Sequence, residues 1–304
     1  MSKRRIFRVA VGLFFGSMMT VCFLPSAPAK DTVKLAYVEW SSSIASTNLV
    51  QAVLQEKMGY NCEIRPMNAD EMWQAVADGE VDAMLSAWLP VSQSHFYEEY
   101  QNRVVNLGPN LKGARIGLVV PDVVISRQIA ATGVPNKPYV TVDSIPELKD
   151  YAKKFNHKII GIDPEAGIMR KTRDAIQVYG LHNLRLVSGS EVSMLAEFSH
   201  AVRKHRWIVV TGWVPHWKFT RWPLKFLEDP KNIYGGEQHI STIARKGLQQ
   251  DMPEVYQFLD VFKWSPEEMS QLLIWIHADQ DMYPYENALR FIRQNKSLIE
   301  SWLP

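Results

Sequence analysis

The fold is indicated by the stretch TVKLAYVEWSSSIASTNLVQAVLQEKM, residues 32–58. Thr32–Val38 is rich in apolar and β-forming residues and predicts a strand, and the apolar spacing of Ile44–Met58 predicts a helix that ends at Gly59. The same order recurs, with strands expected at Asn61–Pro66 and Val81–Ala87 and helices at Asp70–Ala77 and Ser92–Gln101. Repeated strand–helix units indicate an α/β layer with a mainly parallel sheet.

A second series of units follows a strand expected at Ala114–Val120 and a turn-rich stretch at 133–138. We expect helices at Ile145–Phe155, with Ser144 as N-cap, at Gly167–Tyr179 and at Glu191–Lys204. Strands are expected at Lys158–Asp163, Arg185–Val187 and Trp207–Thr211. A strand at His239–Arg245 and three helices between Pro253 and Trp302 complete the chain. We therefore predict two lobes: residues 30–120 and 237–304 form lobe I, and residues 121–236 form lobe II.

The first 29 residues have the pattern of a cleaved signal peptide. A basic start at 3–5 is followed by a mostly apolar run from Ile6 to Leu24, and Ala27-Pro28-Ala29 places small residues before the expected cleavage site. An uncleaved membrane anchor is the alternative. Attachment of a lipid at Cys22 is disfavoured, because Val21 is larger than the residue that usually precedes a lipidated cysteine. We expect an exported, periplasmic protein that is soluble.

The charge of the mature chain argues against polyanionic partners. Of the 34 Lys and Arg residues, four lie in the leader, so 30 remain against 32 acids and the net charge becomes about −2. Binding to nucleic acid or to an anionic membrane surface requires a basic excess. With 46% apolar residues the chain can bury a sizeable core.

Catalytic and metal-binding patterns are missing from the sequence. It contains no Gly-x-Ser-x-Gly, phosphate-loop, His-Glu-x-x-His or dinucleotide motif. Only Cys62 remains after cleavage, which excludes an internal disulfide and a multi-cysteine metal site. His95, His216 and His239 are the only histidines near candidate cleft loops. We expect neither an enzyme nor a cofactor nor a metal.

Three tryptophans are placed where a ligand would bind. Trp40, Trp88 and Trp213 each follow a predicted strand. In open α/β sheets the C-terminal ends of the strands face the ligand crevice. Converging indoles there can hold a quaternary ammonium by cation–π attraction, at about 0.5–2 kcal/mol for each ring. Packing in the core is the alternative role for these rings.

A strand-to-helix turn supplies a second candidate site. In Asp163-Pro164-Glu165-Ala166-Gly167-Ile168-Met169 a strand ends and a helix begins near Gly167. Free N–H groups and the positive end of the helix dipole meet there, which suits a carboxylate. An ordinary structural turn is the alternative.

The chain resembles the compatible-solute receptors of ABC importers, which bind glycine betaine, proline betaine, carnitine or choline. The runs that carry the resemblance cover nearly the whole mature chain: LAYVEW (35–40), IASTN (44–48), MWQA (72–75), LSAWLP (85–90), GLVVP (117–121), IGIDP (160–164), GIM (167–169), TGWVPHW (211–217) and TIARKG (242–247). The resemblance implies a type II periplasmic-binding-protein fold, with two α/β lobes around a ligand cleft and a permease as partner. It also implies a cage of Trp40, Trp88 and Trp213, with carboxylate-binding amides at Gly167 and Ile168.

Two departures from this family bear on the ligand. Betaine receptors of this type carry a carboxylate-binding His five residues after the second cage Trp, where this chain has Gln93, with His95 two further on. Choline-selective relatives carry an acid two residues after the first cage Trp, where this chain has Ser42. We therefore expect betaine or carnitine to bind better than choline, with a preference independent of pH between about 6 and 8, because Gln93 does not titrate. The candidate ligand-binding residues are Trp40, Trp88, Trp213, Gly167, Ile168, Gln93, Ser43 and His95.

Other functions stay open from sequence alone. One alternative is a receptor for choline or another methylated onium compound such as dimethylsulfoniopropionate. An amino-acid receptor and an exported enzyme acting on a methylated zwitterion are further alternatives. An amino-acid receptor would normally need an acidic partner for a primary ammonium, in place of three indoles. An enzyme would need an acid–base pair in the cleft, and the sequence offers none. We expect a monomer that binds a zwitterionic quaternary amine.

Overall fold

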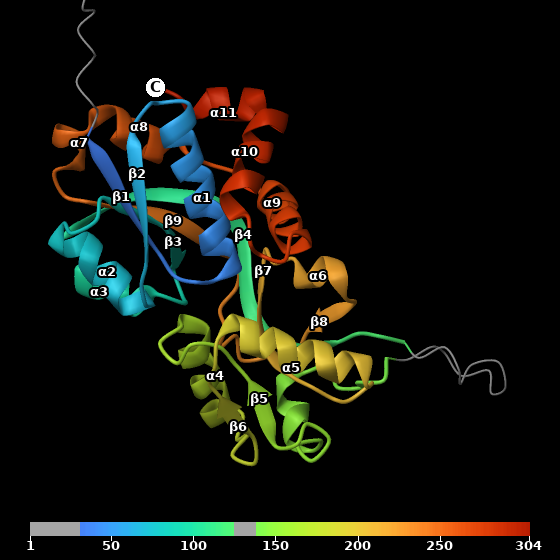
Figure 1. Cartoon of the computed structure of the whole chain (residues 1–304). Helices are drawn as coiled ribbons and strands as arrows, with labels where there is room; N and C mark the ends of the chain where they lie inside the picture. The colour runs from blue at the N-terminus through green and yellow to red at the C-terminus, as the bar shows by residue number, and fades with distance from the viewer. Residues whose placement is uncertain (1–30, 125–137) are drawn as a thin grey trace, which may run out of the picture.

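A single long strand, β4 (Val104–Pro121), connects two α/β lobes in the computed structural model, which describes residues 31–124 and 138–304 (Figure 1). Its first half pairs with β9 (Gln238–Arg245) over Val104–Ala114, and its second half pairs with β7 (Val210–Val214) over Arg115–Val119. The exchange of partner strand falls between Ala114 and Arg115, earlier than the lobe boundary expected at 120/121. The expected signal peptide and most of the turn-rich stretch at 133–138 lie outside the described residues.

Lobe I holds three parallel strands and the C-terminal helices. Its strand order is β2-β1-β3-β9-β4, in which β9 is antiparallel to both of its neighbours. The elements are β1 (Thr32–Tyr37), α1 (Ser41–Glu56), β2 (Asn61–Pro66), α2 (Ala69–Asp78), β3 (Ala83–Leu89), α3 (Ser94–Tyr100), α7 (Leu248–Asp251), α8 (Pro253–Val261), α9 (Pro266–Ala278), α10 (Pro284–Gln294) and α11 (Lys296–Trp302). Helix α1 is covered by α9 and α10, so its middle turns are buried on nearly all sides.

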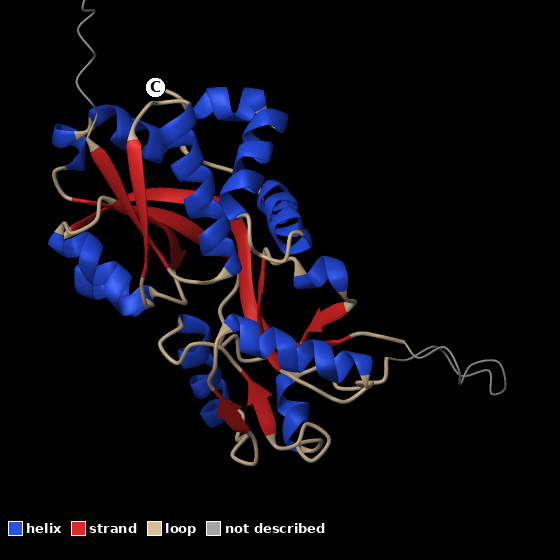
Figure 2. Ribbon diagram, in the orientation of Figure 1, coloured by secondary structure: helices blue, strands red, loops and turns tan. Residues whose placement is uncertain are grey.

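Lobe II repeats the α/β layer on the other half of β4. Its strand order is β4-β7-β5-β6, and β8 pairs with the end of β4. The elements are a 3-10 helix (Ile145–Lys149), β5 (Lys158–Ile160), α4 (Gly167–Val178), β6 (Arg185–Val187), α5 (Glu191–Arg203), α6 (Lys218–Arg221) and β8 (Leu224–Phe226). Figure 2 shows helices around the strands of both lobes, with β4 running from one lobe into the other. The expected mainly parallel sheet is a mixed one, because β4 and β9 run against their neighbours.

Local signals in the sequence explain where several helices begin. Helix α2 starts with a capping box between Asn68 and Glu71 and ends at Gly79 in the left-handed conformation. Helix α9 starts with the same device between Ser265 and Glu268. Each box satisfies backbone N–H groups that would otherwise lack partners.

Three expectations about the elements are wrong, each for a physical reason. The helix expected at 145–155 is only the five-residue 3-10 helix, because the chain turns at Asn156 and packs Tyr151 and Phe155 on Trp207 with ring centroids 5.4 and 5.2 Å apart. The first half of β4 was not expected, since three register shifts around Gly108 and Pro109 break its pattern. The C-terminal region from Pro253 holds four helices rather than three.

Candidate functional site

A pocket lies between the two lobes, beside the middle of β4. Its empty volume, including the opening to solvent, is about 360 Å³. The lining residues are Trp40, Ser42, Trp88, Ser92, Gln93, Ile116, Ile162, Ala166, Gly167, Ile168 and Trp213. None of these described lining residues is ionisable, so the pocket presents apolar rings and neutral hydrogen-bonding groups.

The three tryptophans come from both lobes and meet in this pocket. Trp40 is the N-cap of α1, three residues after the end of β1, and Trp88 lies near the end of β3. Trp213 lies in β7 of lobe II, where it pairs with Ile116 of β4. Trp88 and Trp213 are therefore inside their strands, not beyond them as expected, because each strand extends further than its apolar run. All three rings are less than 10% exposed.

The N-terminus of α4 lines the same pocket without a cap of its own. Its N-cap is Ala166, which offers no side-chain hydrogen bond, and its first turn carries no acid. The N–H groups of Gly167 and Ile168 make none of the hydrogen bonds found among the described residues. A Cβ on Gly167 would come within 2.0 Å of the Ser92 carbonyl oxygen of lobe I, so only glycine allows this approach. The backbone N–H groups at this open helix N-terminus are therefore available to an anion in the pocket.

Gln93 is held in one orientation by two donors. Its side-chain oxygen Oε1 accepts from Trp73 Nε1 and from the Trp88 backbone N–H, both at 3.2 Å. With the oxygen occupied, the amide group of Gln93 is left to donate, and the side chain lines the pocket. It therefore adds a neutral donor beside Trp88.

Ser42, rather than Ser43, faces the pocket. Its Oγ is buried and has no partner among the described residues. Ser43 is also buried, but its Oγ accepts from the Val38 N–H and donates to Ser86 Oγ, so it stabilises lobe I. Helix α1 begins at Ser41, three residues earlier than expected, and this earlier start sets the direction of each serine.

The histidines expected near the cleft do not line the pocket. His95 packs on Phe96 with ring centroids 3.9 Å apart, and burial, followed by the charge of Arg170, lowers its pKa. Burial likewise lowers the pKa of His239 in β9. His216 packs against Trp213 with ring centroids 4.9 Å apart and lies behind that ring. The structure brings together six of the eight predicted site residues and leaves Ser43 and His95 outside the pocket.

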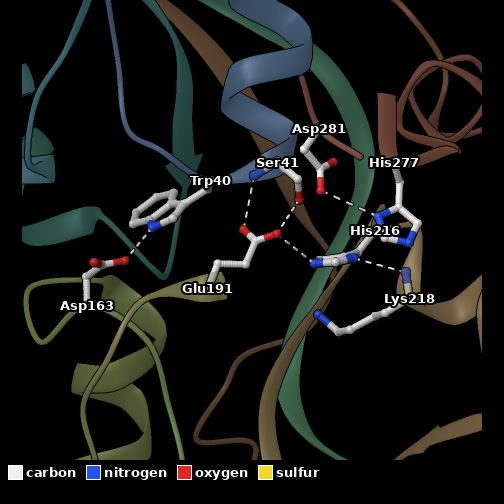
Figure 3. A network of polar contacts seen from close by, with 8 residues as sticks. All are labelled: Trp40, Ser41, Asp163, Glu191, His216, Lys218, His277 and Asp281. Atoms are coloured by element: carbon white, nitrogen blue, oxygen red, sulfur yellow. Dashed lines mark hydrogen bonds and ion pairs between the residues drawn. The ribbon is translucent and has the colours of Figure 1, made fainter. Parts of the chain in front are cut away.

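Two acids of lobe II contact the first residues of α1 across the cleft (Figure 3). Asp163 Oδ2 accepts from Trp40 Nε1 at 2.8 Å. Glu191 accepts from both the backbone N–H of Ser41 at 3.0 Å and its hydroxyl at 2.6 Å. Since α1 has no capping side chain of its own and no acid in its first turn, Glu191 caps it from the other lobe. These bonds exist only when the lobes are in contact.

Behind Trp213 lies a buried cluster of ionisable groups. His216 Nδ1 accepts from the Lys218 backbone N–H at 3.0 Å, so the proton of a neutral ring is on Nε2, 3.1 Å from Glu191 Oε1. Burial, and then Lys218, lower the pKa of His216 to about 4, and burial lowers the pKa of Lys218 to about 7. Burial alone raises the pKa of the Glu191 carboxyl, but His216, Ser41 and Lys218 together hold it below its ordinary value. The sequence did not point to this cluster.

Indole rings and neutral hydrogen-bonding groups line the pocket, which suits the binding of a small molecule. Within residues 31–124 and 138–304, no group of three or more His, Cys, Asp or Glu side chains is placed to hold a metal ion. The helices of the same ranges include none with the length and apolarity needed to cross a bilayer. An apolar aromatic pocket with an open helix N-terminus can hold a small molecule that carries a methylated cation and an anion.

Comparison with known proteins places the chain among substrate-binding proteins of ABC transporters. Residues 31–294 match the family model described as the substrate binding domain of ABC-type glycine betaine transport system. The glycine betaine/carnitine transport binding protein GbuC of Listeria monocytogenes is 42% identical over 176 residues, which are 57% of this chain and 56% of that protein. The match thus spans little more than half the length of this curated relative.

Solved structures of similar proteins cover the chain more fully. The glycine betaine, L-proline-binding protein ProX of Borrelia burgdorferi is 36% identical with a TM-score of 0.81, over 90% of this chain and 97% of that one. Lactococcal OpuAC, in its closed conformation with glycine betaine, is 34% identical with a TM-score of 0.81, over 90% and 100% of the two chains. These likenesses confirm the expected two-lobed α/β binding-protein fold.

Proposed function

The chain belongs to the family of substrate-binding domains of ABC-type glycine betaine transport systems, and on that premise we propose that it is a receptor for a zwitterionic quaternary amine of the glycine betaine class. One observation carries the proposal: indoles of both lobes and the uncapped N-terminus of α4 line the same pocket. In this proposal Trp40, Trp88 and Trp213 enclose the methylated cation. Gly167, Ile168 and Gln93 donate hydrogen bonds to the carboxylate.

The neutral lining favours a zwitterion over choline. Choline brings a cation and a hydroxyl, and no carboxylate of the described lining residues offsets its charge. A betaine carries its own anion, which the N–H groups of α4 and the hydroxyl of Ser42 can bind with charge-assisted hydrogen bonds. Leaving those donors without an anion costs about 1–3 kcal/mol, roughly tenfold to a hundredfold in affinity. We therefore assign betaine or carnitine as the preferred ligand.

The contacts between the lobes support a capture mechanism. Ligand that touches both walls binds the closed arrangement better than the open one, so it shifts the population toward closure. The bonds from Ser41 to Glu191 and from Trp40 to Asp163 add to the closed state. We propose that the exported protein works as a monomer in the periplasm and delivers its closed, loaded form to an ABC permease. No step of this mechanism requires proton transfer.

A ligand panel tests the proposal directly. The shift in melting temperature and the Kd are measured for glycine betaine, proline betaine, carnitine, dimethylsulfoniopropionate and choline, since a ligand of the native state raises its stability. Glycine betaine or carnitine should bind about tenfold to a hundredfold more tightly than choline. Binding of none of these compounds would overturn the proposed function. Choline binding as well as the betaines would overturn the ligand preference alone.

A further inference from the structure

A completely buried lysine lies directly behind the third indole of the pocket. Lys218 is the first residue of α6 and is 0% exposed. Its Nζ has no hydrogen-bond partner among the described residues. It lies 4.0 Å from the centroid of the Trp213 ring. A buried amine without a hydrogen bond is costly unless it is neutral or stabilised by another interaction, and here that interaction is with the ring.

The geometry puts Trp213 between this amine and the ligand pocket. Trp213 lines the pocket, and Lys218 does not. With Lys218 Nζ covering one face of the indole, a ligand in the pocket is left with the opposite face or the edge. The ring quadrupole that attracts a ligand cation is the same one that attracts an ammonium behind it. Two cations on one indole also repel each other.

We propose that Lys218 sets the affinity and the charge selectivity of the pocket through Trp213. As a neutral amine it leaves the ring to the ligand cation, and as an ammonium it competes for that ring. This inference rests on the proposed function, because it needs a cationic group in the pocket. It makes Lys218 a specificity-determining residue that acts without touching the ligand.

The ionisable groups around Lys218 decide which form is present. They are Glu191 at the start of α5, His216 after β7 and, beyond His216, His277 of α9 with Asp281 (Figure 3). Glu191 favours the ammonium, but burial outweighs it, and the pKa of Lys218 falls to about 7. His216 stays neutral near pH 7, because its pKa is lowered to about 4. Lys218 therefore changes charge close to neutral pH while its neighbour His216 does not.

The sign of the pH effect follows from linkage. A ligand cation disfavours the ammonium, so binding releases protons and affinity rises as the pH increases through about 7. Charges about 8 Å apart, on opposite sides of one ring, repel enough at an effective dielectric constant of about 20 to weaken binding about tenfold to thirtyfold. The affinity for a betaine falls less than the affinity for choline when Lys218 is protonated, because the carboxylate of the betaine offsets part of the repulsion. The preference for betaine should therefore grow as the pH falls, in contrast to the pH independence expected from Gln93 alone.

Calorimetry on the wild type and on Lys218→Met tests the inference. The Kd of choline and of glycine betaine is measured at pH 6.5 and 8.5, with the exposed Lys153→Met as a matched control for the loss of a lysine. In the wild type, choline should bind about threefold to fourfold more weakly at pH 6.5 than at pH 8.5, since about three quarters of the free protein carries the ammonium at the lower pH, and betaine should change less. In Lys218→Met the dependence should disappear, with choline affinity at pH 6.5 close to the value at pH 8.5. The Lys153→Met protein should behave as the wild type does.

A second measurement uses only the unaltered protein. Titrations of choline at pH 7 in two buffers of different ionisation enthalpy should show release of a fraction of a proton for each ligand bound. Absence of release, or equal pH dependence in the wild type and Lys218→Met, would overturn the role of Lys218 while leaving the receptor proposal intact. Failure of the wild type to bind either ligand at both pH values would instead overturn the proposed function.

Discussion

Trp40 and Trp213 line the same pocket, yet an acid lies behind the first ring and a basic amine behind the second. The indole N–H of Trp40 donates to the Asp163 carboxylate at 2.8 Å, whereas the face of Trp213 is covered by Lys218 Nζ at 4.0 Å from the ring centroid. A carboxylate that accepts from an indole N–H makes the ring a better partner for a cation, and an ammonium over its face makes it a poorer one. Rings that look equivalent in a cage are therefore tuned separately by the groups outside it.

Trp40 and Trp213 can act on one ligand only when the two lobes close, and Gly167→Ala should disturb that closure most strongly. The added methyl group would lie 2.0 Å from the Ser92 carbonyl oxygen. Because backbone cannot move away as a flexible side chain can, we expect about 3 kcal/mol, roughly a hundredfold, to be lost in ligand affinity. Calorimetry and small-angle scattering with saturating ligand measure the loss of binding and of closure.

The matched control for this variant is Gly236→Ala, where an added Cβ meets nothing within 4 Å. The unliganded Gly167→Ala protein should melt at or above the wild-type temperature, since alanine is the better helix former and the open lobes avoid Ser92. Unchanged affinity in Gly167→Ala would show that the lobes bind ligand without the approach seen here.

Alanine substitution of each cage tryptophan compares the contribution of Trp40, beside Asp163, with that of Trp213, beside Lys218. Trp40→Ala, Trp88→Ala and Trp213→Ala should each weaken binding of glycine betaine by about 1–3 kcal/mol. At pH 6.5 we expect a smaller loss for Trp213→Ala than for Trp40→Ala, because Lys218 already weakens the former ring. Trp275→Ala serves as the control: its ring packs on Phe291 in the C-terminal helices, so stability should fall and the Kd should not change. Equal losses of affinity in Trp40→Ala and Trp213→Ala at every pH would show that the two rings are not tuned differently.

Stability against acid reports on the buried cluster behind Trp213. The pKa of His216 is lowered to about 4 in the folded protein, below the ordinary 6.5, so the unfolded chain binds the proton first. The folded state should lose about 1.4 kcal/mol for each pH unit as the pH falls below about 6.5, until the folded form itself is protonated near pH 4. Urea unfolding between pH 7 and 5 measures the slope.

The variant His216→Gln keeps one donor and one acceptor without a titrating ring. Its stability should therefore fall with decreasing pH less steeply than that of the wild type, by about 1.4 kcal/mol for each pH unit. Substitution of the exposed His182 by Gln is the control and should retain the wild-type slope. A slope unaffected by His216→Gln would mean that other groups account for the acid sensitivity.

Positions of the pocket residues were predictable where they depend on strand ends. The tryptophans and Gly167 follow from the order of strands and helices, because the ends of β1, β3 and β7 and the start of α4 meet at the cleft. The start of a helix is less predictable, and a shift of a few residues in α1 exchanges Ser42 for Ser43 at the pocket. Each residue in a helix turns about 100°, so the helix boundary decides which side chain points where.

The charged groups behind the cage could not have been found from spacing. Glu191 is the first residue of α5, where an acid is favourable in any helix, and nothing local tells that it caps α1 of the other lobe. Lys218 lies among Trp217, Phe219 and Arg221 in a pattern typical of a surface turn. Its burial results from how α6 folds back on β7 and is a property of the tertiary structure alone.

Asp163→Asn gives the smallest and most specific test of the comparison. Asparagine keeps an oxygen that can accept from Trp40 Nε1 but removes the negative charge. We expect choline to bind about twofold to fivefold more weakly, a change of about 0.5–1 kcal/mol, which is opposite in sign to the effect of Lys218→Met. The control is Glu165→Gln, which removes the same charge from the same turn at an exposed position without touching the indole. A double-mutant cycle with Trp40→Ala completes the test, because Asp163→Asn should have no further effect once the ring is gone. If Asp163→Asn weakens binding equally with and without Trp40, the carboxylate acts on the ligand through space, and the ring is not its intermediary.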